Sequence, residues 1–274
     1  MSLIADDPSS LLRFSETSAA ASFGFRFGDK GTHTSRTLML SELETVLANM
    51  PLEASRKVYA DAIINENITD KRTVATRRLT NQRLGELYAL DLSVPLFRLL
   101  RRCWATDKPG RPLLALLCAL ARDPLLRATA PLVLSMKPGD ELSRQSMTEA
   151  VMATVGGRLN DNTLDKVVRN ASSSWAQSGH LRGRVNKVRQ SVSPTPATLA
   201  YALVLGYLLG LRGQRLFNTL WAKALDSTAD NLVFLAMDAN RLGFLDMKHA
   251  GNVIDVGFNI VLTPDELREC HGSS

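Results

Sequence analysis

The spacing of apolar residues along the chain predicts a mainly α-helical protein. From residue 36 onward, apolar side chains recur three or four positions apart, which is the period of an amphipathic helix. Thr69 is the expected N-cap of the helix that follows it. The other predicted helices lie at about 36–50, 52–65, 94–105, 111–122, 125–136, 140–156, 161–178, 196–210, 213–225 and 228–242.

Two short stretches alternate apolar and polar residues, which is the period of a β-strand. Between residues 245 and 258 the alternation continues on both sides of Gly251-Asn252, and this pattern predicts a β-hairpin. After the Gly179 turn, residues 182–189 form a short, basic, extended segment. A helix, a tight turn and a basic ribbon in this order are the outline of a winged helix.

Turn residues divide the chain into an arm and two lobes. Residues 1–35 are expected to form an irregular N-terminal arm whose rings pack onto the body of the protein. Pro138-Gly139 predicts a boundary between an N-terminal helical lobe, 36–138, and a C-terminal lobe, 139–274, that carries the ribbon and the hairpin. The phenylalanines of the arm are Phe14, Phe23, Phe25 and Phe27.

Charge changes this picture, because it is unevenly spread. The chain has 33 Lys and Arg against 27 Asp and Glu, a net charge of +6. Residues 166–193 nevertheless hold six basic side chains and no acid, and residues 71–83 hold five and no acid. A surface without carboxylates favours a polyanionic partner. The alternative is that each run is only a solvated face.

The helix expected at 161–178 has one apolar and one polar face. An apolar stripe runs along it from Leu164 to Trp175. Side chains on the opposite face suit hydrogen bonds to phosphates and base edges, because Arg matches guanine while Asn and Gln match adenine. They are Lys166, Arg169, Asn170, Ser173 and Gln177.

The ribbon after this helix is the predicted wing. Because alternate residues of a strand share a face, its basic side chains are expected to project in pairs along a phosphate backbone. These pairs are Arg182 with Arg184, and Lys187 with Arg189. Charges of this kind also protect a solvated edge strand from aggregation, which is the alternative interpretation.

The first basic run resembles the second helix of a helix-turn-helix, with residues 65–68 as the turn. Helix pairs with short turns also occur in proteins that bind no DNA. The predicted contacts in this run are Lys71, Arg72, Arg77, Arg78 and Arg83.

Signals for catalysis are poor, so no enzyme activity, cofactor, metal or small-molecule substrate is expected. The four histidines are scattered without metal-ligand spacing, and the loop at 24–32 lacks the P-loop spacing. The three cysteines favour a reducing cytoplasm over a disulfide scaffold. Residues 197–211 hold about 14 apolar side chains, fewer than the roughly 20 of a membrane span, so a buried helix is expected there.

Two segments, 65–84 (NENITDKRTVATRRLTNQRL) and 163–183 (TLDKVVRNASSSWAQSGHLRG), resemble the BrxA family of bacterial BREX phage-defence systems. The resemblance implies a small, two-lobed helical protein that binds double-stranded DNA, has no catalytic activity and works beside other BREX components. The positions that it marks as DNA contacts are Lys71, Arg72, Arg77, Arg78, Arg169, Arg182 and Arg184.

The sequence therefore favours a non-enzymatic protein that binds double-stranded DNA mainly through its phosphates. Two alternatives stay open. The chain could be a protein–protein adaptor whose basic surfaces dock an acidic subunit, with the Gly206/Gly210 helix and the phenylalanine-rich arm serving assembly. It could also be the RNA-binding subunit of a defence complex.

Overall fold

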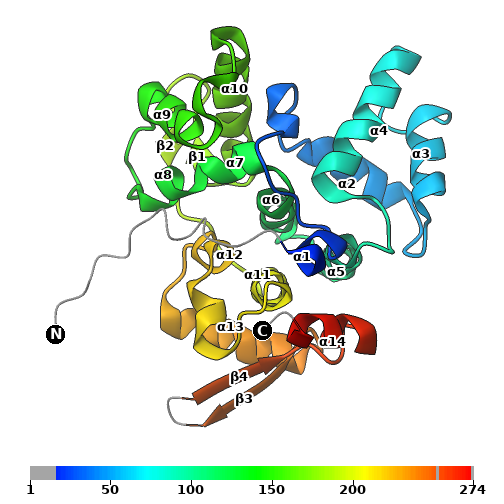
Figure 1. Ribbon diagram of the computed structural model, residues 1–274, viewed down its shortest axis with the longest axis vertical. Helices are drawn as coiled ribbons and strands as arrows, with labels where there is room; N and C mark the ends of the chain where they lie inside the picture. The colour runs from blue at the N-terminus through cyan, green and yellow to red at the C-terminus, as the bar shows by residue number, and fades with distance from the viewer. Residues whose placement is uncertain (1–16, 251–252, 273–274) are drawn as a thin grey trace.

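The computed structural model describes residues 17–250 and 253–272 and is mainly helical, as predicted (Figure 1). The elements of the first half are α1 Ser18–Ser22, the 3-10 helix η2 Thr32–Thr34, α2 Leu40–Asn49, α3 Arg56–Ile64, α4 Val74–Tyr88, α5 Pro95–Thr106, α6 Arg111–Arg122, α7 Pro124–Ala128 and α8 Ala130–Ser135. Those of the second half are α9 Arg144–Val155, η3 Gly156–Arg158, α10 Asp161–Gln177, β1 Leu181–Arg182, β2 Val188–Arg189, α11 Pro196–Leu208, η4 Gly213–Asn218, α12 Leu220–Lys223, α13 Ala229–Arg241, β3 Asp246–Ala250, β4 Val253–Gly257 and α14 Pro264–Gly272.

The start of α4 differs from the prediction. Thr73, not Thr69, is the N-cap, and its hydroxyl accepts a hydrogen bond from the Thr76 backbone N–H. Asn67 Oδ1 accepts from the Lys71 backbone N–H at 2.8 Å and closes a turn within the connection. The link from α3 to α4 therefore spans residues 65–73, which is longer than the three- or four-residue turn of a helix-turn-helix.

Two other predicted helices are interrupted. The helix expected at 125–136 is split into α7 and α8 at Thr129, whose hydroxyl accepts a hydrogen bond from Trp175 Nε1 at 2.8 Å. The helix expected at 213–225 is η4 followed by α12, because Thr219 has an extended backbone and caps α12 with its side chain.

Aromatic residues of the N-terminal arm pack onto the body, as expected. Phe23 and Phe25 are buried, and the Phe25 ring meets Trp221 edge-on at 5.8 Å between centroids. Phe27 is partly buried against the same core. Phe14 lies outside the described residues.

The β1–β2 ribbon belongs to a winged-helix arrangement. The two strands pair antiparallel, with Leu181 opposite Arg189. Residues 139–142 run antiparallel along the other edge of β2, since Gly139 N donates to Arg189 O at 2.9 Å and Leu142 N to Lys187 O at 2.7 Å. The elements α8, 139–142, α9, α10, β1 and β2 thus follow the helix–strand–helix–helix–strand–strand order of a winged helix. Residues 183–187 are its wing.

The remaining helices build the core that carries this unit. Nearly every side chain of α6 and α11 is buried, so the apolar segment at 197–211 is an internal helix, as predicted. The helices of the described residues are all too short or too polar to cross a bilayer. The predicted C-terminal hairpin is confirmed as β3–β4, although its turn residues 251–252 lie outside the described part of the chain. The lobe boundary at 138–139 stays a prediction.

Candidate nucleic-acid interface

A groove of about 520 Å³ lies between α10 and the wing. Its basic side chains come from three elements: Arg144 from the first turn of α9, Arg169 from α10, and Arg184 with Lys187 from the wing. The groove is also lined by Leu142, Val168, Ser172, Ser173 and Val185. Four of the predicted site residues, Arg169, Ser173, Arg184 and Lys187, are therefore brought together in one place.

One carboxylate stands among these cations. Asp165 forms an ion pair with Arg169 Nε at 3.0 Å and a second ion pair with Arg144 Nη2. Both arginines remain largely exposed, so their ion pairs are weak and can open to a competing anion. Among the described residues, Asp165 is the one carboxylate that forms an ion pair with a groove cation, and the four cations outnumber it.

Around the groove, further predicted cations face solvent. Lys166 and Arg182 are exposed and, like Arg184 in the groove, form no ion pair with any carboxylate in the described part of the chain. Val185, at the tip of the wing, is 87% exposed. The wing is therefore a projecting, basic loop with an apolar tip.

Three predicted contacts are not on the open face. Arg189 is 2% exposed and forms an ion pair with Asp226, so the prediction that it projects with Lys187 was wrong. Asn170 Nδ2 donates to the His33 carbonyl at 2.8 Å. Gln177 Nε2 donates to Thr37 Oγ1 at 2.9 Å. These amides join α10 to residues 33–40, and base contacts from them would break that junction.

The five basic residues of the first run have different surroundings. Lys71 Nζ lies 2.9 Å from Glu42 Oε1, and Arg83 Nη1 lies 2.7 Å from Glu86 Oε2. Arg77 donates through Nε to the Lys71 carbonyl at 3.1 Å. The exposed cations of this run that form no ion pair within the described residues are Arg72 and Arg78.

A Ser–His–Asp chain that the sequence did not reveal lies beside α10. His33 Nδ1 is 2.8 Å from Asp123 Oδ2, and His33 Nε2 is 2.8 Å from Ser174 Oγ. These spacings match a nucleophile–base–acid triad. All three side chains are buried, however, and Ser174 Oγ already accepts the Leu38 backbone N–H at 2.8 Å. Within the described part of the chain the hydroxyl is closed off from solvent, and the chain of hydrogen bonds joins α10 to α7 and to residues 33–38.

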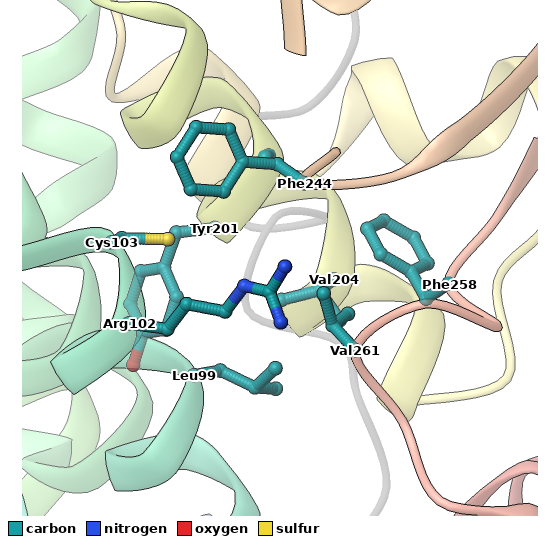
Figure 2. Close-up of a pocket in the computed structure, with 9 residues that line it drawn as sticks. Leu99, Arg102, Cys103, Tyr201, Val204, Phe244, Phe258 and Val261 are labelled. Atoms are coloured by element: carbon teal, nitrogen blue, oxygen red, sulfur yellow. The ribbon is translucent and has the colours of Figure 1, made fainter. Parts of the chain in front are cut away.

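A second pocket offers little room. Figure 2 shows a site lined by Leu99, Cys103 and Phe244 among others, with a volume of about 10 Å³, enough for about one water molecule. Burial raises the pKa of the Cys103 thiol to about 12, which keeps it protonated and unreactive. Among the described residues no cluster of three or more His, Cys, Asp or Glu is placed to hold a metal ion.

His180 fixes the base of the wing and makes it sensitive to acid. Its Nε2 donates to the Ala224 carbonyl at 2.9 Å, and Nδ1 lies 2.9 Å from Ser178 Oγ. Burial lowers the pKa of His180 from 6.5 to about 4, against the opposing pull of Asp226. The folded protein thus holds His180 neutral where the unfolded chain protonates it.

We expect acid to destabilise the wild type through His180. Stability from this group is complete above pH 6.5 and falls as the pH drops from 6.5 to about 4, by about 3 kcal/mol in all. The variant His180→Gln keeps a donor for Ala224 and removes the titration. Urea denaturation at pH 7.5 and pH 4.5 should therefore show a smaller acid loss in the variant than in the wild type. Equal losses would contradict the assignment.

No family model and no curated protein sequence matches this chain.

Proposed function

We propose that this chain is a non-enzymatic protein that binds double-stranded DNA through the groove between α10 and the wing. The observation that supports the proposal is the convergence of four cations from α9, α10 and the wing on one hollow surface of about 520 Å³. Phosphate oxygens are the natural ligands for such a set. In line with the resemblance to BrxA proteins, we propose a role in bacterial phage defence beside other BREX components.

The physical basis of binding is the release of counterions from the DNA. Each phosphate that a Lys or Arg neutralises adds about −0.9 to the slope of log affinity against log salt. The four groove cations, together with exposed Lys166, predict a slope between about −4 and −5 for duplex DNA. Sequence preference is expected to be small, because the amides of Asn170 and Gln177 are engaged within the protein.

The experiment that tests this function is a double charge reversal in the groove. Arg169→Glu with Arg184→Glu should weaken binding to a 24-base-pair duplex about 100-fold at 100 mM salt and reduce the salt slope by about 2. Folding should hardly change, because both side chains are exposed. Fluorescence anisotropy at several salt concentrations measures both quantities.

The matched control reverses two cations outside the groove. Lys108 and Arg215 are exposed, and neither forms an ion pair among the described residues. Lys108→Glu with Arg215→Glu changes net charge by the same amount, so it should weaken binding less than threefold. A control that loses as much affinity as the groove variant would show that only net charge matters. Preferential displacement of the labelled DNA by duplex RNA would favour the RNA-binding alternative.

An adaptor role is a second candidate because of α13. Phe234 is 64% exposed and Leu242 is 63% exposed, and Met237 lies on the outer side of the same helix. Large exposed apolar side chains on one surface are typical of protein contacts. Partners that stay bound after nuclease treatment, and that are lost in Phe234→Asp, would favour the adaptor.

A further inference from the structure

The open face of α10 has a flank on each side. On one side the groove toward the wing reaches Val168 and Ser172 of the helix. Asn170 and Gln177 are seven positions apart, two turns of helix, and both point to the other side. Between these two sides lies the exposed stripe that carries Lys166 and Arg169.

The second flank is formed by residues 33–40, which lead into the N-terminal (first) lobe. Asn170 Nδ2 donates to His33 O at 2.8 Å, and Gln177 Oε1 accepts from the Leu40 backbone N–H at 3.1 Å. Leu38 N and Ser174 Oγ add a buried hydrogen bond at 2.8 Å. Residues 33–40 are therefore held along α10 opposite the wing, and they lead directly into α2.

This flank is also basic. Arg36, in the middle of the segment, is partly exposed, and its Nη1 donates to the Ser35 carbonyl at 3.0 Å. It forms no ion pair with the carboxylates that the structure describes. Lys71, in the connection before α4, forms an ion pair with Glu42 of α2, and exposed Arg72 follows it in the chain. In Figure 1, α10 (green, upper left) and α4 (cyan, upper right) both lie above the central α6.

We propose that the first lobe binds the second phosphate backbone of the duplex that α10 and the wing engage. The major groove is about 12 Å wide, admits an α-helix and has one sugar–phosphate backbone on each side. With α10 in this groove, Arg184 and Lys187 contact one backbone while Arg36 and Arg72 contact the other. This inference rests on the proposed function and adds the partner strand, the residues that hold it and the reason for two lobes.

The test compares duplex with single-stranded DNA of equal length. Arg36→Glu with Arg72→Glu should weaken duplex binding at least tenfold, because contacts to one backbone are lost. A single strand offers one backbone, which the wing side holds, so the same variant should lose less than threefold on it. Anisotropy titrations at 100 mM salt give both values, and Lys108→Glu with Arg215→Glu is again the control for charge. Thermal melting checks that all three proteins are folded.

Separate outcomes identify which idea fails. If Arg169→Glu with Arg184→Glu binds duplex as tightly as the wild type, the proposed function is wrong. If that variant loses binding while Arg36→Glu with Arg72→Glu behaves like the control, the function stands and the two-backbone arrangement is overturned. An equal loss on duplex and single strand for the Arg36 and Arg72 variant overturns the arrangement too, since it would show contact with the same backbone.

Discussion

Replacing Asp123 by Ala is expected to lower the free energy of unfolding by about 3–5 kcal/mol. Oδ2 accepts from the Thr32 backbone N–H at 2.7 Å, the His33 backbone N–H at 3.2 Å and His33 Nδ1 at 2.8 Å. Oδ1 accepts from the backbone N–H groups of Leu125 and Leu126 at 3.0 and 3.1 Å. Removing the carboxylate leaves these donors unpaired in a buried site. Chemical denaturation followed by circular dichroism measures the loss.

The pH dependence of this loss of stability tests whether the ionised carboxylate of Asp123 is its cause. Burial raises the pKa of Asp123, but His33 and the backbone donors outweigh burial, and the net pKa is lowered. A carboxyl with a lowered folded pKa contributes stability above its unfolded pKa of about 3.9, and this contribution is lost as the pH falls through the folded pKa. The difference between wild type and Asp123→Ala should therefore be full at pH 7 and shrink below about pH 4.

The matched control is Asp91→Ala. Asp91 Oδ1 accepts from the Ser93 backbone N–H at 3.0 Å in a partly exposed turn, where water replaces a lost partner. Asp91→Ala should lower the free energy of unfolding by no more than about 1 kcal/mol. A comparable loss in both variants would mean that burial of the Asp123 donors is not what makes that carboxylate important.

Helices could be predicted from the sequence because each carries a periodic apolar face. The stripe on α10 is an example, since Val167, Val168, Ala171 and Trp175 are buried as expected. The start of α4 could not be placed, because Thr69 and Thr73 are both acceptable caps. The connection of nine residues before α4 has positive φ at Asn67 and Asp70, so the helix begins only after Thr73.

The alternation of residues along the ribbon did not show which of its two faces is buried. Cross-strand partners share a side of the ribbon, and the register places Arg182 opposite Val188 and Leu181 opposite Arg189. Leu181 is buried, so Arg189 points inward with it. The prediction treated both faces of the ribbon as exposed to solvent, whereas the face that carries Leu181 and Arg189 is buried against the protein.

Contacts between residues far apart in the chain could not be predicted from the sequence. His33 lies 90 residues from Asp123 and 141 residues from Ser174, and none of these three residues has a local pattern that marks the others. Arg144 and Arg36 were missed for a related reason. Each lies outside the two acid-free runs, and the fold brings Arg144 into the groove while it holds the segment of Arg36 along α10.

Replacing Arg189 by Met is expected to cost about 3–5 kcal/mol, because it leaves the carboxylate of Asp226 without its partner in a largely buried site. Arg189 Nε also donates to the Val133 carbonyl at 3.0 Å, so this side chain joins the base of the wing to α8 and to the loop after α12. The exposed neighbour Arg182 supplies the control, since Arg182→Met should change stability by no more than about 0.5 kcal/mol. Urea denaturation at pH 7 compares the two variants.

A double variant separates the orphaned charge from the lost packing. In Arg189→Met with Asp226→Asn no charge is left unpaired, and Asn tolerates the positive φ of 49° at position 226. Its stability should therefore exceed that of Arg189→Met alone, although the bond to Val133 is still missing. If the double variant is no more stable, the hydrogen bonds of the guanidinium to backbone carbonyls are what fix the wing. In either case Arg189 acts from inside the fold, because its side chain is buried. We therefore predict that the proposed DNA binding at the groove weakens only as far as the wing opens.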